Sequence, residues 1–143
     1  MSLFDIVDLI EIKLYYKYVS FNGSKKIHII DDSKAEEILK DPEKEKEIEC
    51  LVTKWSMMNW KEQNDILSAS TLPTGPSGEK QFNFLVYRDA VVKRCLKEWD
   101  ITVNQKPVPI TKDAIDKLPG NIVFALYKKF EKVIDYSEDD LGN

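Results

Sequence analysis

Residues 10–30, IEIKLYYKYVSFNGSKKIHII, decide the fold because they have the pattern of a β-hairpin. In the first half of this stretch apolar and charged side chains alternate, which is typical of a strand with one face buried. Asn22 and Gly23 are the pair that a tight two-residue turn prefers, because both tolerate positive φ. We therefore predict a strand from Ile10, a turn at Asn22, and a partner strand over 25–30.

A two-stranded hairpin is only marginally stable in water, so this one needs further contacts. It must pack against helices, gain a third strand from residues 3–9, or pair with another molecule. The last alternative would make the protein a homo-oligomer. In each alternative the open edge of the hairpin is the feature that has to be covered.

The rest of the chain is predicted to be mostly helical. Asp41 with Pro42 is typical of a helix start, Asn59 with Glu62 forms a capping box, and Thr111 is a further N-cap. The expected helices cover residues 33–39, 42–55, 60–69, 87–99 and 121–134. Their apolar stripes predict a core that includes Leu51, Trp55, Trp60, Leu96, Trp99, Leu118, Leu126 and Phe130.

These elements predict one α+β domain, mostly helical, with an antiparallel β-hairpin near the N-terminus. The length of 143 residues fits a single domain with its own core. The expected order is a hairpin region over 1–32, helices over 33–70, a flexible loop over 71–81, C-terminal helices over 82–136 and an acidic tail over 137–143.

The composition is that of a folded domain, with 43% hydrophobic and 32% charged residues. A net charge of −4, without a basic stripe on any predicted element, argues against nucleic-acid partners. No apolar run reaches the roughly 18 residues of a membrane helix, and the first residues do not resemble a secretory signal. We therefore expect a cytoplasmic protein without nucleic-acid or membrane partners.

No catalytic or metal site can be recognised in the sequence. His28 is the sole histidine, and no serine or cysteine nucleophile has a histidine base in a known arrangement. Cys50 and Cys95 lie in apolar patterns that are predicted to be helical, where a thiol acts as a small hydrophobic residue. Residues 75–80 have neither the spacing nor the context of a phosphate-binding loop. We predict no enzymatic activity, no cofactor and no metal.

Three motifs follow one another in the second half of the chain. They are CLKEWD at 95–100, the run P-I-T-x-x-x-I-x-x-L-P at 109–119, and IVFALYKKFEKV at 122–133. A helix with Trp55 and Trp60 and then a polar loop precede them. In this order of elements, residues 51–136 resemble the small tail assembly chaperones of tailed bacteriophages.

The resemblance implies a non-enzymatic protein that binds the long tape-measure protein and keeps it soluble while the tail tube polymerises. Such a protein would act in the host cytoplasm. Two alternatives stay open, namely a permanent component of the virion in the tail, baseplate or neck, and a small protein-interaction domain with another role. The expected partner is the tape-measure protein or another tail or virion protein.

The predicted partner-binding surface combines the edge of the hairpin with the last helix. Tyr15 and Val19 are apolar members of the otherwise charged face of the hairpin. The last helix carries an apolar stripe wider than one neighbour covers, and it is expected to contribute Tyr127, Phe130 and Ile134. A partner would bind there by β-augmentation or by packing of a helix in a groove.

Overall fold

Strand β1 (Ile10–Phe21) is a central strand of a four-stranded antiparallel sheet. It pairs with β2 (Ser24–Ile30) on one side and with β3 (Glu49–Trp55) on the other. β6 (Leu96–Trp99) pairs with the outer side of β3, so the strand order is β2-β1-β3-β6. The computed structural model describes residues 9–134, which form a single α+β domain.

The predicted hairpin is confirmed. Asn22 and Gly23 form its turn with φ values of 50° and 80°, and Phe21 lies opposite Ser24 in the register of the two strands. The third strand that the hairpin needs is β3. Of residues 3–9, the alternative source of that strand, residues 3–8 lie outside the described part of the chain and Leu9 lies in no strand.

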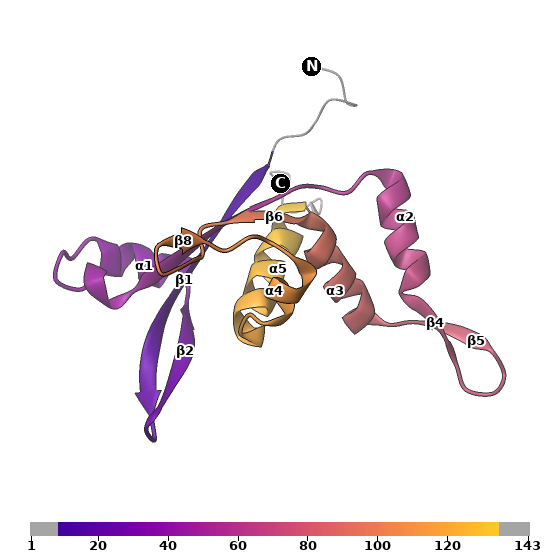
Figure 1. Ribbon diagram of the computed structural model, residues 1–143, viewed down its shortest axis with the longest axis horizontal. Coiled ribbons are helices and arrows are strands. Elements are labelled where there is room, and N and C mark those ends of the chain that lie inside the picture. The colour runs from indigo at the N-terminus through magenta and orange to yellow at the C-terminus, as the bar shows by residue number, and fades with distance from the viewer. Residues whose placement is uncertain (1–8, 135–143) are drawn as a thin grey trace, which may run out of the picture.

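Helices α3 (Phe84–Cys95), α4 (Lys112–Asp116) and α5 (Gly120–Ile134) pack against the sheet (Figure 1). Their apolar side chains meet the inward side chains of β1 and β3 in one core. At its centre the rings of Trp55 and Phe130 stack, with centroids 4.7 Å apart and planes inclined by 23°. The buried core residues are Ile12, Leu14, Leu51, Trp55, Val91, Val92, Cys95, Leu96, Ile115, Ile122, Leu126, Tyr127 and Phe130.

Thr53 is a fully buried polar residue within this core. Its hydroxyl donates a hydrogen bond to the carbonyl of Ile12 at 2.8 Å and accepts one from the indole N–H of Trp55 at 2.7 Å. A buried hydroxyl is costly unless it is hydrogen-bonded, so this arrangement favours one register of β3 on β1 and one orientation of the Trp55 ring.

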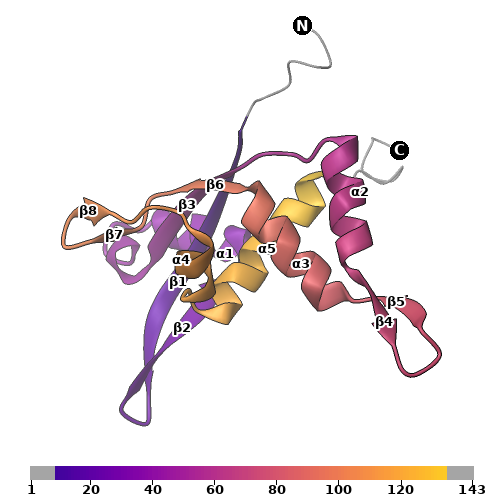
Figure 2. The same cartoon turned by 45° about the vertical axis from the view of Figure 1, so that its right-hand side comes forward.

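The remaining elements surround the core. α1 (Asp32–Leu39) follows β2 and buries Ala35. α2 (Trp60–Ala69) stands beside α3, and the hairpin of β4 (Thr71–Thr74) and β5 (Glu79–Phe82) projects beyond it (Figure 1 and Figure 2). The β1–β2 turn also extends past the helices, in another direction. The shortest elements are the 3-10 helix η2 (Glu45–Glu47) and the strands β7 (Thr102–Val103) and β8 (Lys106–Pro107).

The prediction of a mostly helical domain is wrong, because 42% of the described residues are helical and 33% lie in strands. The predicted helix over 42–55 is replaced by η2 and β3, and the predicted helix over 87–99 ends at Cys95, where β6 follows. In both segments the spacing of the apolar residues is compatible with either a helix or a strand. Pairing with a neighbouring strand decides between them, since the hairpin needs a partner on its open side.

The core prediction is confirmed for most of the residues named. The buried members are Leu51, Trp55, Leu96, Leu126 and Phe130. Trp99 and Leu118 are half-buried. The prediction is wrong for Trp60, which is 77% exposed at the first position of α2. The capping box that starts this helix, Asn59 with Glu62, is confirmed.

Candidate protein-binding surfaces

A groove runs beside the first half of β1, because β2 is shorter than β1. β2 ends at Ile30, opposite Tyr15, so residues 10–14 have no partner strand on this side. α1 and α5 form the other walls of the groove, whose volume is about 760 Å³. We call it the β1 groove. Its lining includes Glu11, Lys13 and Tyr15 of β1, Asp32, Ser33 and Glu36 of α1, and Ala125, Lys129, Lys132 and Val133 of α5.

The open edge of β1 in this groove is partly occupied by Lys129. The Lys129 ammonium donates to the carbonyl of Lys13 at 2.7 Å and also to the carboxylate of Asp32. Alternate residues of an antiparallel strand direct their backbone groups to opposite sides, so Glu11 and Lys13 present theirs to the groove. The edge could accept an extended peptide, and Lys129 protects it in the free protein.

The structure separates the predicted partner-binding residues. Tyr15 lines the β1 groove, whereas Val19 lies on the projecting part of the hairpin. Tyr127 and Phe130 are 4% and 0% exposed within the core, and Ile134 is half-buried against it. Tyr127 and Phe130 are therefore core residues and not part of a free surface. α5 offers a partner other side chains, namely Ala125, Lys129 and Val133 in the groove and Phe124 near its first turn.

A second surface combines the end of β5, the first two turns of α3 and Phe124 of α5. We call Phe82, Phe84, Leu85, Arg88 and Phe124 the aromatic surface. The phenylalanines and the leucine are all exposed, and the guanidinium of Arg88 lies over the rings of Phe84 and Phe124. Aromatic residues and arginine are enriched at protein interfaces.

The aromatic surface was not predicted from the sequence. Residues 82–86 have the pattern of apolar residues that precede or begin a core helix. Periodicity does not show which apolar side chains of such a helix a neighbouring element will cover. Only the positions of α3 and α5 show that this end of α3 extends past its neighbours. An uninterrupted apolar run, Phe84-Leu85-Val86, at a helix start was the available indication.

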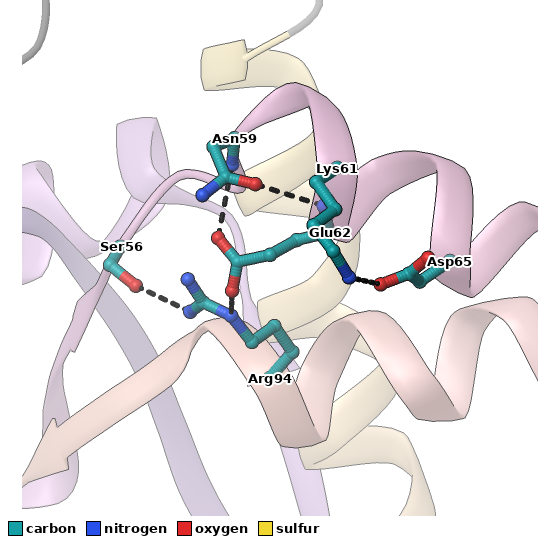
Figure 3. A network of polar contacts seen from close by, with 6 residues as sticks. All are labelled: Ser56, Asn59, Lys61, Glu62, Asp65 and Arg94. Carbon is teal, nitrogen blue, oxygen red and sulfur yellow. Dashed lines mark hydrogen bonds and ion pairs between the residues drawn. The ribbon is translucent and has the colours of Figure 1, made fainter.

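Helix α2 is attached to this body by polar contacts and by Ile66, which packs against the core, and none of its residues is fully buried. One carboxylate oxygen of Glu62 accepts the N–H of Asn59 at 3.1 Å, and the other accepts a hydrogen bond from Arg94 of α3 (Figure 3). Arg94 also donates to the hydroxyl of Ser56 at 3.0 Å. Since helices in proteins are stabilised mainly by burying an apolar face, α2 depends on this network.

Acidification is expected to loosen α2. The Arg94 guanidinium, together with the Asn59 N–H, lowers the pKa of the Glu62 carboxyl from its ordinary 4.5 to about 2. A carboxyl with a depressed pKa stabilises the fold above its unfolded pKa, and this contribution is lost as the pH falls toward the folded value. NMR amide shifts of α2 should therefore change between about pH 4.5 and pH 2.

The Glu62→Gln variant should lack this pH response and show a less firmly held α2 already at neutral pH. Asp65→Asn is the matched control, because among residues 9–134 the Asp65 carboxylate pairs with no cation except the exposed Lys61 on the same helix. It should leave the response unchanged. An identical pH profile in wild type and Glu62→Gln would contradict the assignment.

The two cysteines do not have the features of reactive thiols. Burial raises the pKa of the Cys95 thiol to about 11, and desolvation by neighbouring groups also raises the pKa of the Cys50 thiol. The prediction that Cys50 lies in a helix is wrong, because it is an exposed residue of β3. Within residues 9–134 no three potential metal ligands come together. None of the helices described there has the length and apolar character to span a membrane.

Comparison with known proteins gives no match: no family model fits the chain, and no curated protein or solved structure is significantly similar to it. The surfaces of the molecule and the motifs in its sequence are therefore the features that point to its function.

Proposed function

We propose that this protein is a non-enzymatic binding protein that keeps the tape-measure protein of a bacteriophage tail soluble during tail assembly. The proposal starts from the three motifs that resemble those of tail assembly chaperones. They form the junction of α3 and β6, the short helix α4 with its Thr111 cap, and helix α5. Two of these helices, α3 and α5, carry all of the aromatic surface except Phe82, which lies on β5.

The observation that carries the proposal is the exposure of this aromatic surface. Leu85 is 63% exposed, and Phe84 and Phe124 are 46% and 39% exposed. Clustered exposed apolar side chains are typical of sites that bind another protein. An assembly chaperone needs such a site while it is free, because it must cover apolar side chains of a client that would otherwise aggregate.

The arm formed by α2 and the β4–β5 hairpin supports the same proposal. It exposes Trp60, Leu67, Leu72 and Phe82, although it buries almost no apolar side chain of its own. An element with few buried apolar contacts can move at low cost when a client binds beside it. The arm would then cover part of a client that lies along α3.

The second candidate is a permanent virion component, and the two projecting hairpins favour it. The β1–β2 hairpin exposes Tyr18 and Phe21 near its turn, and the β4–β5 hairpin exposes Leu72 and Phe82. Projecting strands with apolar side chains are suited to burial against neighbouring copies in a symmetric assembly.

Mass spectrometry of purified phage particles separates the two candidates. If the protein is an assembly chaperone, we expect it in infected cells during tail assembly and not in mature particles. The tail tube protein of the same particles provides the internal standard. Stoichiometric amounts in the particle would overturn the chaperone proposal in favour of a virion component.

A further inference from the structure

Arg88 is held between two exposed aromatic rings. The carbon of its guanidinium lies 6.0 Å from the centre of the Phe84 ring and 5.0 Å from the centre of the Phe124 ring. Within residues 9–134 it forms no ion pair, and its neighbour Asp89 pairs with Lys93 at 3.1 Å. Contacts with ring faces orient a guanidinium and leave its N–H groups free to donate.

A small socket opens beside Arg88, between α3, α4 and the start of α5. Its volume is about 200 Å³, and Arg88 and Phe124 are among the residues that line it. The apolar part of its lining consists of Leu85, Val92, Ile115, Leu118 and Val123. This space suits one aliphatic side chain, and an anchor of that kind at the centre of an interface contributes much of the binding energy.

We infer that the aromatic surface binds an amphipathic helix of the client through a pair of side chains. An aliphatic side chain of that helix enters the socket, and a carboxylate one turn away binds Arg88. Side chains three or four residues apart lie on the same face of a helix, so one helix can supply both. The inference rests on the proposed function, because it describes how the client is held.

The chemistry of Arg88 favours a carboxylate as its partner. A guanidinium binds a carboxylate through two parallel hydrogen bonds, and its position beside apolar side chains strengthens this contact. Asp89 and Asp116 also line the socket, but both pair with Lys93, which weakens their repulsion of a single carboxylate. Nucleic acid fits less well, because a chain of phosphates would bring several negative charges beside them. A single acidic residue within an apolar helix face supplies the carboxylate for Arg88 and avoids the repeated charges of a phosphate chain.

Two synthetic peptides test the inference. Each has about 20 residues, long enough to form a helix, with a leucine stripe in which one position is glutamate in the first peptide and glutamine in the second. The glutamate follows a leucine by four residues. The wild-type protein should bind the glutamate peptide roughly tenfold more tightly, the effect expected of a hydrogen bond to a charged group. Calorimetric titration measures both affinities.

The Arg88→Gln variant should bind both peptides equally and keep the unfolding midpoint of the wild type, because Arg88 forms no ion pair within the described residues. Lys128→Gln is the matched control, since the Lys128 ammonium lies 5.0 Å from the same Phe124 ring. It should keep the preference for glutamate. Alanine in place of the leucine that lies four residues before the glutamate should weaken binding of the peptide to both protein variants.

Equal affinity for the two peptides, no binding of either, or loss of the preference in Lys128→Gln would overturn the inference. Tighter binding of a thymidine oligonucleotide at the same surface would also overturn it, in favour of nucleic acid. These outcomes are distinct from failure of the proposed function. A protein that keeps the tape-measure protein soluble without preferring glutamate would refute only the inference.

Discussion

Replacing Phe130 with alanine is expected to lower the free energy of unfolding by about 3–5 kcal/mol, the usual cost of truncating a fully buried aromatic side chain. Phe130 is 0% exposed and stacks on Trp55, where α5 crosses the sheet. The change would leave a cavity between the two layers of the domain. Since a domain of this size has a total stability of only about 5–15 kcal/mol, the loss is large. Urea denaturation measures it.

Phe124→Ala is the matched control for this prediction. It makes the same chemical change on the same helix, so the gain in helix propensity is shared. Because Phe124 is 39% exposed, we expect a much smaller loss of stability. Similar losses in the two variants would show that α5 does not pack on the sheet through Phe130.

Replacing Leu85 with aspartate is expected to weaken binding of the client by about 30-fold or more while the protein stays folded. Leu85 is 63% exposed at the second position of α3, where a carboxylate is favourable to the helix dipole. In a complex, however, the charge would be buried against apolar side chains of the client. A loss of 2 kcal/mol or more, about 30-fold in affinity, is expected at the centre of an interface.

The corresponding control is Val103→Asp. Val103 is 59% exposed and lies on β7, outside the aromatic surface. Both variants add one negative charge and should have the unfolding midpoint of the wild type. Co-purification of the tape-measure protein with each variant measures binding. If Leu85→Asp retained the client as well as Val103→Asp does, the aromatic surface would not be the binding site.

The hairpin was predictable from sequence because its information is local. Alternation fixes which side chains face inward, and Asn22 with Gly23 places the turn within one residue. The caps at Asn59 and Thr111 were predictable for the same reason, since each depends on residues three positions apart. Turns and helix caps can be predicted without knowledge of the fold, because they depend on residues that are close together in the sequence.

Strand β3 shows where local information is insufficient. Leu51, Thr53 and Trp55 alternate as in a strand, but the hydroxyl of Thr53 interrupts the apolar pattern and the spacing of the other residues also fits a helix. In the structure that hydroxyl is paired with Ile12 and with the Trp55 indole. The prediction failed because the contact with Ile12 becomes visible only after β3 has paired with β1.

The candidate sites depended even more on tertiary structure. The wide apolar stripe of α5 was predicted correctly as a pattern, but the core covers Tyr127 and Phe130 and leaves Phe124 outside. The socket beside Arg88 is formed by α3, α4 and α5, which are separated along the chain. No spacing within a single element indicates such a site.

The most direct test of the proposed function is co-expression of the wild-type protein with the tape-measure protein of the same phage. The tape-measure protein expressed alone should aggregate, because its apolar helix faces have no tail tube to cover them. We predict that co-expression moves it into the soluble fraction as a complex with this protein. Aggregation to the same extent with and without the protein, at equal expression, would contradict the account.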